Sequence, residues 1–293
     1  MKLLRNLLDG IKPHFEKGGK FEKLHPVYDG FETFAFVPNH TAKNGTHIKD
    51  GIDLKRTMIM VVFALIPCLL FGIWNTGHQH FLALGQFVGA GEGFWDKIVF
   101  GAIQVMPIVV VSYAVGLGVE FAFAVKNGHS VEEGFLVSGM LIPLCLPVGV
   151  PLWMVAVATV FAVVLGKEVF GGTGMNVLNP ALTARAFLFF AYPTKMSGDK
   201  VWIDTTVEEG SAILDGFSGA TPLANGVAGA MDQMPSMFEA FIGIIPGSIG
   251  ETSALACLLG AALLLFTGIA SWRVMLSMFI GGYLMGFIFN IAG

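Results

Sequence analysis

The chain has 293 residues, of which 54% are hydrophobic and 13% are charged, and its mean hydropathy is +0.71. This composition is typical of an integral membrane protein and excludes an ordinary soluble domain. A net charge of −4 without a basic tract excludes nucleic acid as a partner, and the three cysteines share no metal-ligand spacing, so no metal site is predicted.

Residues 1–56 form a polar, positively charged lead-in. They hold ten of the seventeen Lys and Arg residues, and positive charge marks the cytoplasmic side of membrane proteins, so we expect a cytoplasmic N-terminus. The segment Met1–Ile11 is amphipathic, but it is too short and too polar for a signal peptide. We expect it to lie along the membrane lipid or to pack on a partner.

The apolar segments predict an all-α, polytopic membrane helix bundle. We expect membrane spans at residues 57–74, 98–124, 134–150, 151–168, 255–270 and 272–291, with a glycine-rich loop at 75–97. With an outward run at 179–193 these make about seven crossings, each near the ~20 residues that a ~30 Å hydrocarbon core requires.

Two stretches interrupt this pattern. Residues 171–180, rich in glycine and ending in Asn179-Pro180, predict a broken helix with a polar elbow at membrane depth or just inside it. Residues 236–254 predict a second short or re-entrant piece. On a helical turn Asn176 and Asn179 would share a face, and their amides suit the edge of a flavin ring. The plainer interpretation, which the residues favour, is that Asn179 is an N-cap before Pro180.

Glu120 lies within the second span. A charged group at mid-helix costs ~3 kcal/mol on insertion scales, so it normally faces a partner or a water-filled path. It is either a cation or proton station or a side chain that snorkels beside Lys126, and both interpretations stay open. In the lead-in, Asp29 and Glu32 are expected to be solvated.

A polar loop at residues 194–235 contains Asp215-Gly-Phe-Ser-Gly-Ala-Thr221, followed by Pro222. Proline suits the first helical position, so we expect Thr221 at the N-cap. A phosphate ester on its hydroxyl would meet backbone N–H groups and the positive end of the helix dipole, although an ordinary capped turn explains the same residues. Counting crossings places this loop on the outer face.

A serine hydrolase is excluded at this loop. Gly216-Phe-Ser-Gly-Ala220 differs by one residue from the Gly-x-Ser-x-Gly elbow, which also needs a later histidine. All seven histidines precede Ser218.

The stretch that ends at Thr221 matches the flavinylation signature D-x-x-S/T-G-A-T, whose last threonine carries FMN through a phosphoester. Together with Asn176-Val-Leu-Asn-Pro-Ala181 and Ile245-Pro-Gly-Ser-Ile-Gly-Glu251, it makes the chain resemble one family along essentially its whole length. That family comprises the NqrB subunit of the Na⁺-translocating NADH:quinone reductase and the RnfD subunit of Rnf complexes. The N-terminal extension favours the NqrB branch.

The resemblance implies covalent FMN, non-covalent riboflavin, ubiquinone as electron acceptor and Na⁺ as the exported ion. It assigns FMN to Thr221 within a motif completed by Asp215, Ser218, Gly219 and Ala220. It also suggests riboflavin near the Asn176 and Asn179 elbow, and it matches Glu120 and Asp29 to acids on the ion path. No side chain of the chain itself is predicted to be catalytic.

The resemblance also implies a cellular location, a complex of subunits and a division of the chain into parts. The chain would belong to a six-subunit complex of the bacterial inner membrane, in a fold of two inverted repeats of five spans. Its parts would be a cytoplasmic extension (1–56), a first membrane repeat (57–193), a periplasmic loop (194–235) and a partial second repeat (236–293). Because the family's subunit continues through further spans, we expect a C-terminal truncation. The alternatives are an Rnf-type subunit and a small-solute permease.

Overall fold

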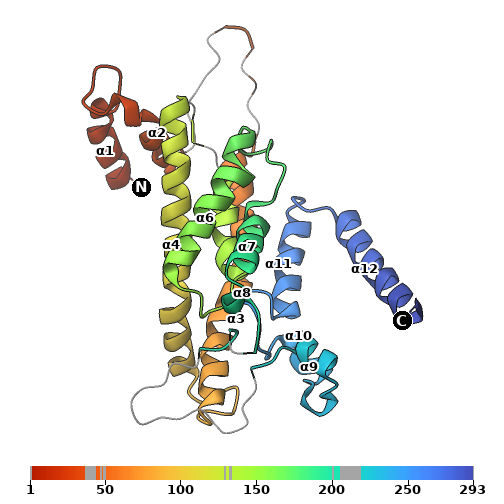
Figure 1. Cartoon of the computed structure of the whole chain (residues 1–293). Helices are drawn as coiled ribbons and strands as arrows, with labels where there is room; N and C mark the ends of the chain where they lie inside the picture. The colour runs from red at the N-terminus through yellow and green to blue at the C-terminus, as the bar shows by residue number, and fades with distance from the viewer. Residues whose placement is uncertain are drawn as a thin grey trace.

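The computed structural model describes residues 2–36, 44–46, 48, 51–128, 130, 131, 134–199, 201–204 and 219–292. Within these residues every regular element is helical, which confirms the predicted all-α class (Figure 1). Four helices are long and apolar enough to cross a membrane, and three shorter helices are apolar. The four are α3 (Leu54–Ala83), α4 (Phe94–Asn127), α6 (Leu152–Gly166, extended by a short 3₁₀ turn) and α12 (Trp272–Ala292). The shorter three are α5 (Phe135–Leu144), α7 (Pro180–Ala191) and α11 (Ala254–Phe266).

Helices α3 and α4 form a long antiparallel pair at the centre of the bundle. The loop predicted at 75–97 is present but shorter, because α3 continues to Ala83 and α4 begins at Phe94. At 1.5 Å per residue the two helices are about 45 and about 51 Å long, which exceeds a ~30 Å hydrocarbon core. They pack closely through glycine, since a Cβ on Gly101 would overlap the carbonyl oxygen of Ile73.

The bundle has two distinct ends, which we call the near end and the far end. The near end holds the first turn of α3 and the last turn of α4, and the far end holds Ala83 and Phe94. Helices α1 (Lys2–Ile11) and α2 (His25–Ala35) lie beside the upper part of α4 in Figure 1, which is the near end. There the rings of Phe31 and Phe121 lie 5.8 Å apart.

Helices α5, α6 and α7 run up and down beside α4. Ser112 Oγ and Tyr113 Oη of α4 donate to carbonyl oxygens of α5 at 3.0 and 2.7 Å. The predicted span at 134–150 is helical only to Leu144, and a non-helical segment, residues 145–151, leads into α6. The core of this layer consists of fully buried apolar side chains, namely Val105, Ile108, Phe135, Ile142, Leu146, Val155, Val163 and Leu188.

A second non-helical segment, residues 243–253, packs against the first. Ile249 N donates to Leu146 O at 3.1 Å and Gly250 N to Leu144 O at 2.9 Å. This segment follows the short helix α10 (Met237–Ile242), so the predicted short piece at 236–254 is confirmed. Helix α11 then packs along α3, whereas α12 lies apart from the other helices (Figure 1).

Candidate functional site

Thr221 is the N-cap residue of α9 (Pro222–Ala228), as predicted. Its Oγ1 accepts a hydrogen bond from Ala224 N at 3.3 Å, and its φ and ψ of −71° and 157° are the extended values of a cap. Pro222 occupies the first helical position. Thr221 is partly exposed, so a phosphate can be joined to this hydroxyl without displacing a packed core.

Gly219 fixes the chain two residues before this cap. It is buried, and a Cβ at this position would overlap the carbonyl oxygen of Asp199 and lie 3.3 Å from Ile203 Cδ1. Any side chain would therefore push residues 219–221 away from the segment 199–203. Ala220 is partly exposed, while Asp215 and Ser218 lie outside the described residues.

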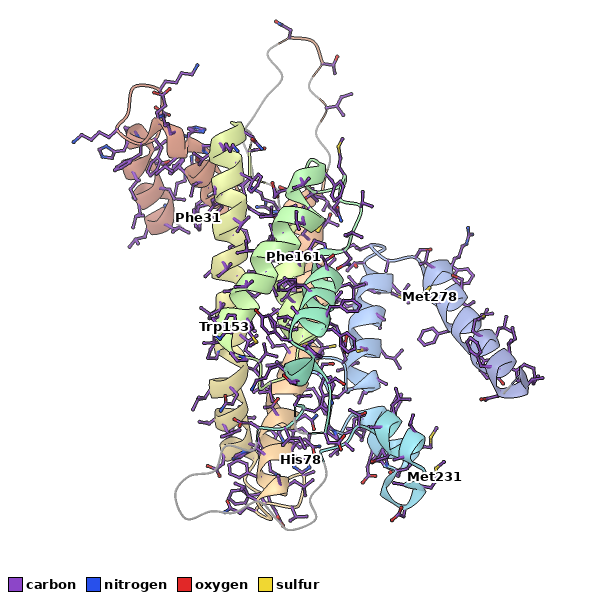
Figure 2. The ribbon with its side chains drawn as sticks, in the orientation of Figure 1. Phe31, His78, Trp153, Phe161, Met231 and Met278 are labelled. Carbon is purple, nitrogen blue, oxygen red and sulfur yellow. The ribbon has the colours of Figure 1, made fainter. Side chains whose placement is uncertain are left out.

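The segment beneath Gly219 is held at the far end of the bundle. Ile203 is buried, and Asp204 O accepts a hydrogen bond from Nδ1 of His80 in α3 at 2.7 Å. The His80 ring stacks on Phe100 of α4 with centroids 3.8 Å apart. In Figure 2 the labelled residues His78, in α3, and Met231, just after α9, lie at this same end.

The N-terminal helices and Thr221 therefore lie at opposite ends of the bundle. Arg56, in the first turn of α3, donates to Thr33 O of α2 at 3.2 Å. Uninterrupted helix separates Arg56 from His80, and at 1.5 Å per residue these residues are about 36 Å apart. That distance spans a ~30 Å hydrocarbon core.

Glu120 is buried and ion-paired. Its side chain is 2% exposed and pairs with Nζ of Lys167, which is 3% exposed and directly follows α6. Glu168 Oε1 lies 3.7 Å from the same Nζ. Snorkelling beside Lys126 is therefore wrong, because the charge of Glu120 is directed into the bundle and not toward the surface.

The two asparagines of the elbow do not share a helical face, because α7 begins only at Pro180. Asn179 is its N-cap, with Oδ1 accepting from Ala181 N and Leu182 N at 2.9 and 3.2 Å, so the plainer interpretation is confirmed. Asn176 lies in the preceding turn and donates to Leu178 O at 3.0 Å. Both residues are exposed near the Lys167 end of α6, which leaves their amides accessible.

Charged residues of α1, of the turn that follows it and of α2 hold the N-terminal helices together. Glu32 lies 3.2 Å from Arg5 and 3.4 Å from Lys12, so the expectation that it is solvated is wrong. Tyr28 donates to Leu8 O at 3.1 Å, and burial, with the nearby Glu32 carboxylate, raises the pKa of Tyr28 to about 12. Asp29 is partly exposed on α2, one turn before Thr33, whose hydroxyl donates to its carbonyl oxygen at 2.6 Å.

A pocket that the sequence did not indicate lies between α2 and the near end of α4. It has a volume of about 160 Å³ and almost entirely apolar walls. Lys55 is the charged residue of its lining, and the apolar walls include Gly30, Phe31, Phe34, Leu117, Phe121 and Leu136. An apolar cavity with one polar group suits a flat, lipid-soluble ring.

Comparison with known proteins identifies the family of the chain. The NQR2, RnfD, RnfE family matches residues 41–293. The NqrB subunit of the Na⁺-translocating NADH-quinone reductase from Chromohalobacter salexigens is 46% identical, over 99% of this chain and 73% of the relative. The same subunits from Pseudomonas paraeruginosa and Azotobacter vinelandii are 45% and 44% identical, over 99% of this chain and 75% and 76% of the relatives. The chain therefore belongs to the NQR2, RnfD, RnfE family of membrane proteins.

Proposed function

We propose that the chain is the membrane subunit of a Na⁺-translocating NADH:quinone oxidoreductase in the bacterial inner membrane. It carries FMN on Thr221, passes electrons through riboflavin to ubiquinone, and couples this transfer to Na⁺ export within a complex of six subunits. The observation that carries the proposal is the partly exposed N-cap residue Thr221, at the opposite end of the bundle from the positively charged N-terminus. In this orientation the N-terminus is cytoplasmic and Thr221 is periplasmic.

The residues around Thr221 fit a phosphoester. A phosphate on Oγ1 places anionic acceptors beside the N–H groups of the first turn of α9, where one N–H already bonds this oxygen. Gly219 keeps the backbone two residues before Thr221 against Asp199, which fixes the approach of the chain to the attachment point. When bound, FMN supplies the electron-carrying chemistry, and the chain supplies its attachment and its position.

Riboflavin is assigned to the elbow at Asn176 and Asn179. Asn179 uses Oδ1 for the cap, and within the described residues its Nδ2 group makes no hydrogen bond, so two N–H donors remain for a flavin carbonyl. The elbow lies at the Lys167 end of α6, opposite Thr221. Electrons passing between the two flavins would therefore cross the bundle.

The pocket between α2 and α4 is assigned to the ubiquinone ring. Its aromatic and aliphatic walls suit a quinone ring, and Lys55 can donate a hydrogen bond to a quinone carbonyl. It lies at the near end, as does the elbow, so riboflavin and ubiquinone share one side of the membrane. Helix α2 forms one wall of this pocket.

Glu120 and Asp29 are assigned to the Na⁺ path. Na⁺ prefers oxygen ligands, and the Glu120 carboxylate is occupied by Lys167 in this structure. Lys167 Nζ contacts Oε1 of this carboxylate, so a Na⁺ ion bound there would compete with the lysine for the same negative charge. Asp29 lies on α2 at the near end, outside the buried pair.

The decisive experiment is flavin detection on the denatured chain. Made together with a flavin transferase, the wild-type band should fluoresce under ultraviolet light, and mass spectrometry should place FMN on the Thr221 peptide. Thr221→Ala should be dark at equal amounts of protein. A dark wild-type band would overturn the proposal and favour a permease. Na⁺-stimulated quinone reduction by the assembled complex, measured against ferredoxin–NAD exchange, distinguishes an Rnf-type subunit.

A further inference from the structure

The far end of α3 presents several polar side chains that are almost fully buried. Asn75, Gln79 and His80 are each 5% exposed, in a stretch that extends beyond the predicted span. Side chains buried to this extent usually have hydrogen-bond partners, because a polar group that loses its hydrogen bonds to water and gains none in the protein destabilises the fold. Two of these side chains find their partners in backbone that is remote in sequence.

His80 holds the segment that leads toward Thr221. Its Nδ1 donates to Asp204 O at 2.7 Å, across 124 residues of sequence. Stacking on Phe100, with an interplanar angle of 15°, fixes the plane of the ring and therefore the direction of this N–H. The contact is directional and does not depend on apolar burial alone.

Asn75 holds the segment that returns from Thr221. Its Nδ2 donates to Ile245 O at 3.0 Å, across 170 residues. Its Oδ1 accepts from Gln79 Nε2 at 3.4 Å, which fixes the orientation of the amide. The carbonyl of Ile245 lies directly before Pro246, at the start of the non-helical segment that packs on α5.

These two contacts bracket the stretch that carries Thr221. Asn75 and His80 are five residues apart, about 7.5 Å along the helix axis, so both contacts lie within about one and a half turns of α3. Gly219 packs against Asp199 and Ile203. Ile203 directly precedes Asp204, whose carbonyl oxygen accepts the hydrogen bond from His80. The position of Thr221 relative to the bundle therefore depends on α3 side chains.

We propose that His80 and Asn75 are positioning residues for Thr221. They hold Asp204 and Ile245, which lie on either side of Thr221 in the sequence, at the far end of α3 as a clamp, and they thereby set the place of the attached FMN relative to the bundle. This inference rests on the proposed function of Thr221. Both residues act through the backbone that carries the flavin and not by direct contact with it.

The test uses the assembled complex with three variants. His80→Leu removes the donor and the ring, His80→Asn keeps a donor at the position of Nδ1, and His78→Leu is the matched control. His78 is also buried in α3 and stacks on Trp74 at 4.9 Å, but its Nδ1 bonds no group among the described residues. The readouts are amide hydrogen exchange at 201–204 and 219–224, flavin per chain, and the midpoint potential of the Thr221 flavin.

We expect exchange at 219–224 to rise about fivefold or more in His80→Leu, the loss that corresponds to one directed hydrogen bond, because the Ala224 N–H that bonds Thr221 Oγ1 belongs to the cap that this contact positions. The flavin potential should shift in this variant, and His80→Asn should restore both values toward wild type. Equal exchange in His80→Leu and wild type, or equal loosening by His78→Leu, would overturn the clamp. Amide exchange can be measured whether or not flavin is present. A wild-type chain without flavin on Thr221 would therefore overturn the proposed function but would leave the test of the clamp intact.

Discussion

Lys167 and Glu120 form one buried ion pair between the end of α6 and the C-terminal part of α4. Both side chains are at most 3% exposed, and they are 47 residues apart in sequence. Removing two charges from water is costly, and their attraction offsets this cost only while both partners are present. The pair therefore joins the two helices only while both charged side chains are in place.

Lys167→Met should destabilise the chain by about 3–5 kcal/mol, because it leaves a buried carboxylate without its cation. The double variant Glu120→Gln with Lys167→Met should be markedly more stable than Lys167→Met alone, since it buries no unpaired charge. Thermal unfolding of the detergent-solubilised complex is compared for wild type, the two single variants and the double variant, which together form a double-mutant cycle. Purely additive effects would show that the two side chains are not coupled.

Glu120→Gln should raise the Na⁺ concentration that half-maximally stimulates quinone reduction, because the amide cannot offer an anionic ligand. The flavin content should not change, since Glu120 lies at the other end of the bundle from Thr221. Stimulation by Na⁺ is measured on the assembled complex with NADH as donor, and Asp96→Asn, an exposed acid in the first turn of α4, is the control. Wild-type Na⁺ dependence in Glu120→Gln would remove this residue from the ion path.

Gly219→Ala should prevent or strongly reduce flavin attachment while Thr221 stays intact. The added Cβ overlaps the carbonyl oxygen of Asp199, so the segment before the cap must move. Gly226→Ala is the matched control, because a Cβ in that part of α9 meets nothing within 4 Å. In-gel flavin fluorescence at equal protein compares the two, and equal fluorescence in both variants would show that the packing of Gly219 is dispensable.

Features set by neighbouring residues could be predicted from the sequence. Thr221 before Pro222 and Asn179 before Pro180 are both N-caps, because a cap depends on one side chain and the next few N–H groups. The spans at α4, α6 and α12 followed from apolar runs of sufficient length. These signals are local, so they can be recognised without knowledge of the fold.

Features set by distant residues could not be predicted. Asn75, His78 and His80 make the end of α3 look like a polar loop, yet contacts with α4 and with the segments near 204 and 245 bury them in a helix. The partner of Glu120 was missed for the same reason, because no spacing rule links it to Lys167. Asp215 and Ser218 lie outside the described residues, so their part in attachment stays a prediction.

The start of α10 should loosen in acid. Glu239 accepts from Ser236 N and from Ser236 Oγ, both at 2.8 Å, and these hydrogen bonds lower the pKa of Glu239. A depressed folded-state pKa contributes stability above the unfolded pKa of about 4.3, and this stability is lost as the pH falls through the lower folded value. Amide exchange at 236–240, corrected for intrinsic rates, should be faster in Glu239→Gln than in wild type at neutral pH. The difference should shrink as the pH falls below the unfolded pKa, and a difference that does not shrink there would exclude the carboxylate as its cause.

Filling the pocket between α2 and α4 should weaken the use of ubiquinone. Gly30 lines this pocket, and a Cβ there would make only ordinary contacts with Val131 at 3.5 Å, so Gly30→Ala is tolerated and raises helix propensity in α2. Gly30→Leu extends into the cavity of about 160 Å³ and competes with a ring for the same space. We expect Gly30→Leu to raise the KM for ubiquinone several-fold at unchanged flavin content, while Gly30→Ala behaves like wild type. Because both variants remove the same glycine, a KM raised equally in both would point to α2 backbone effects and against a quinone in this pocket.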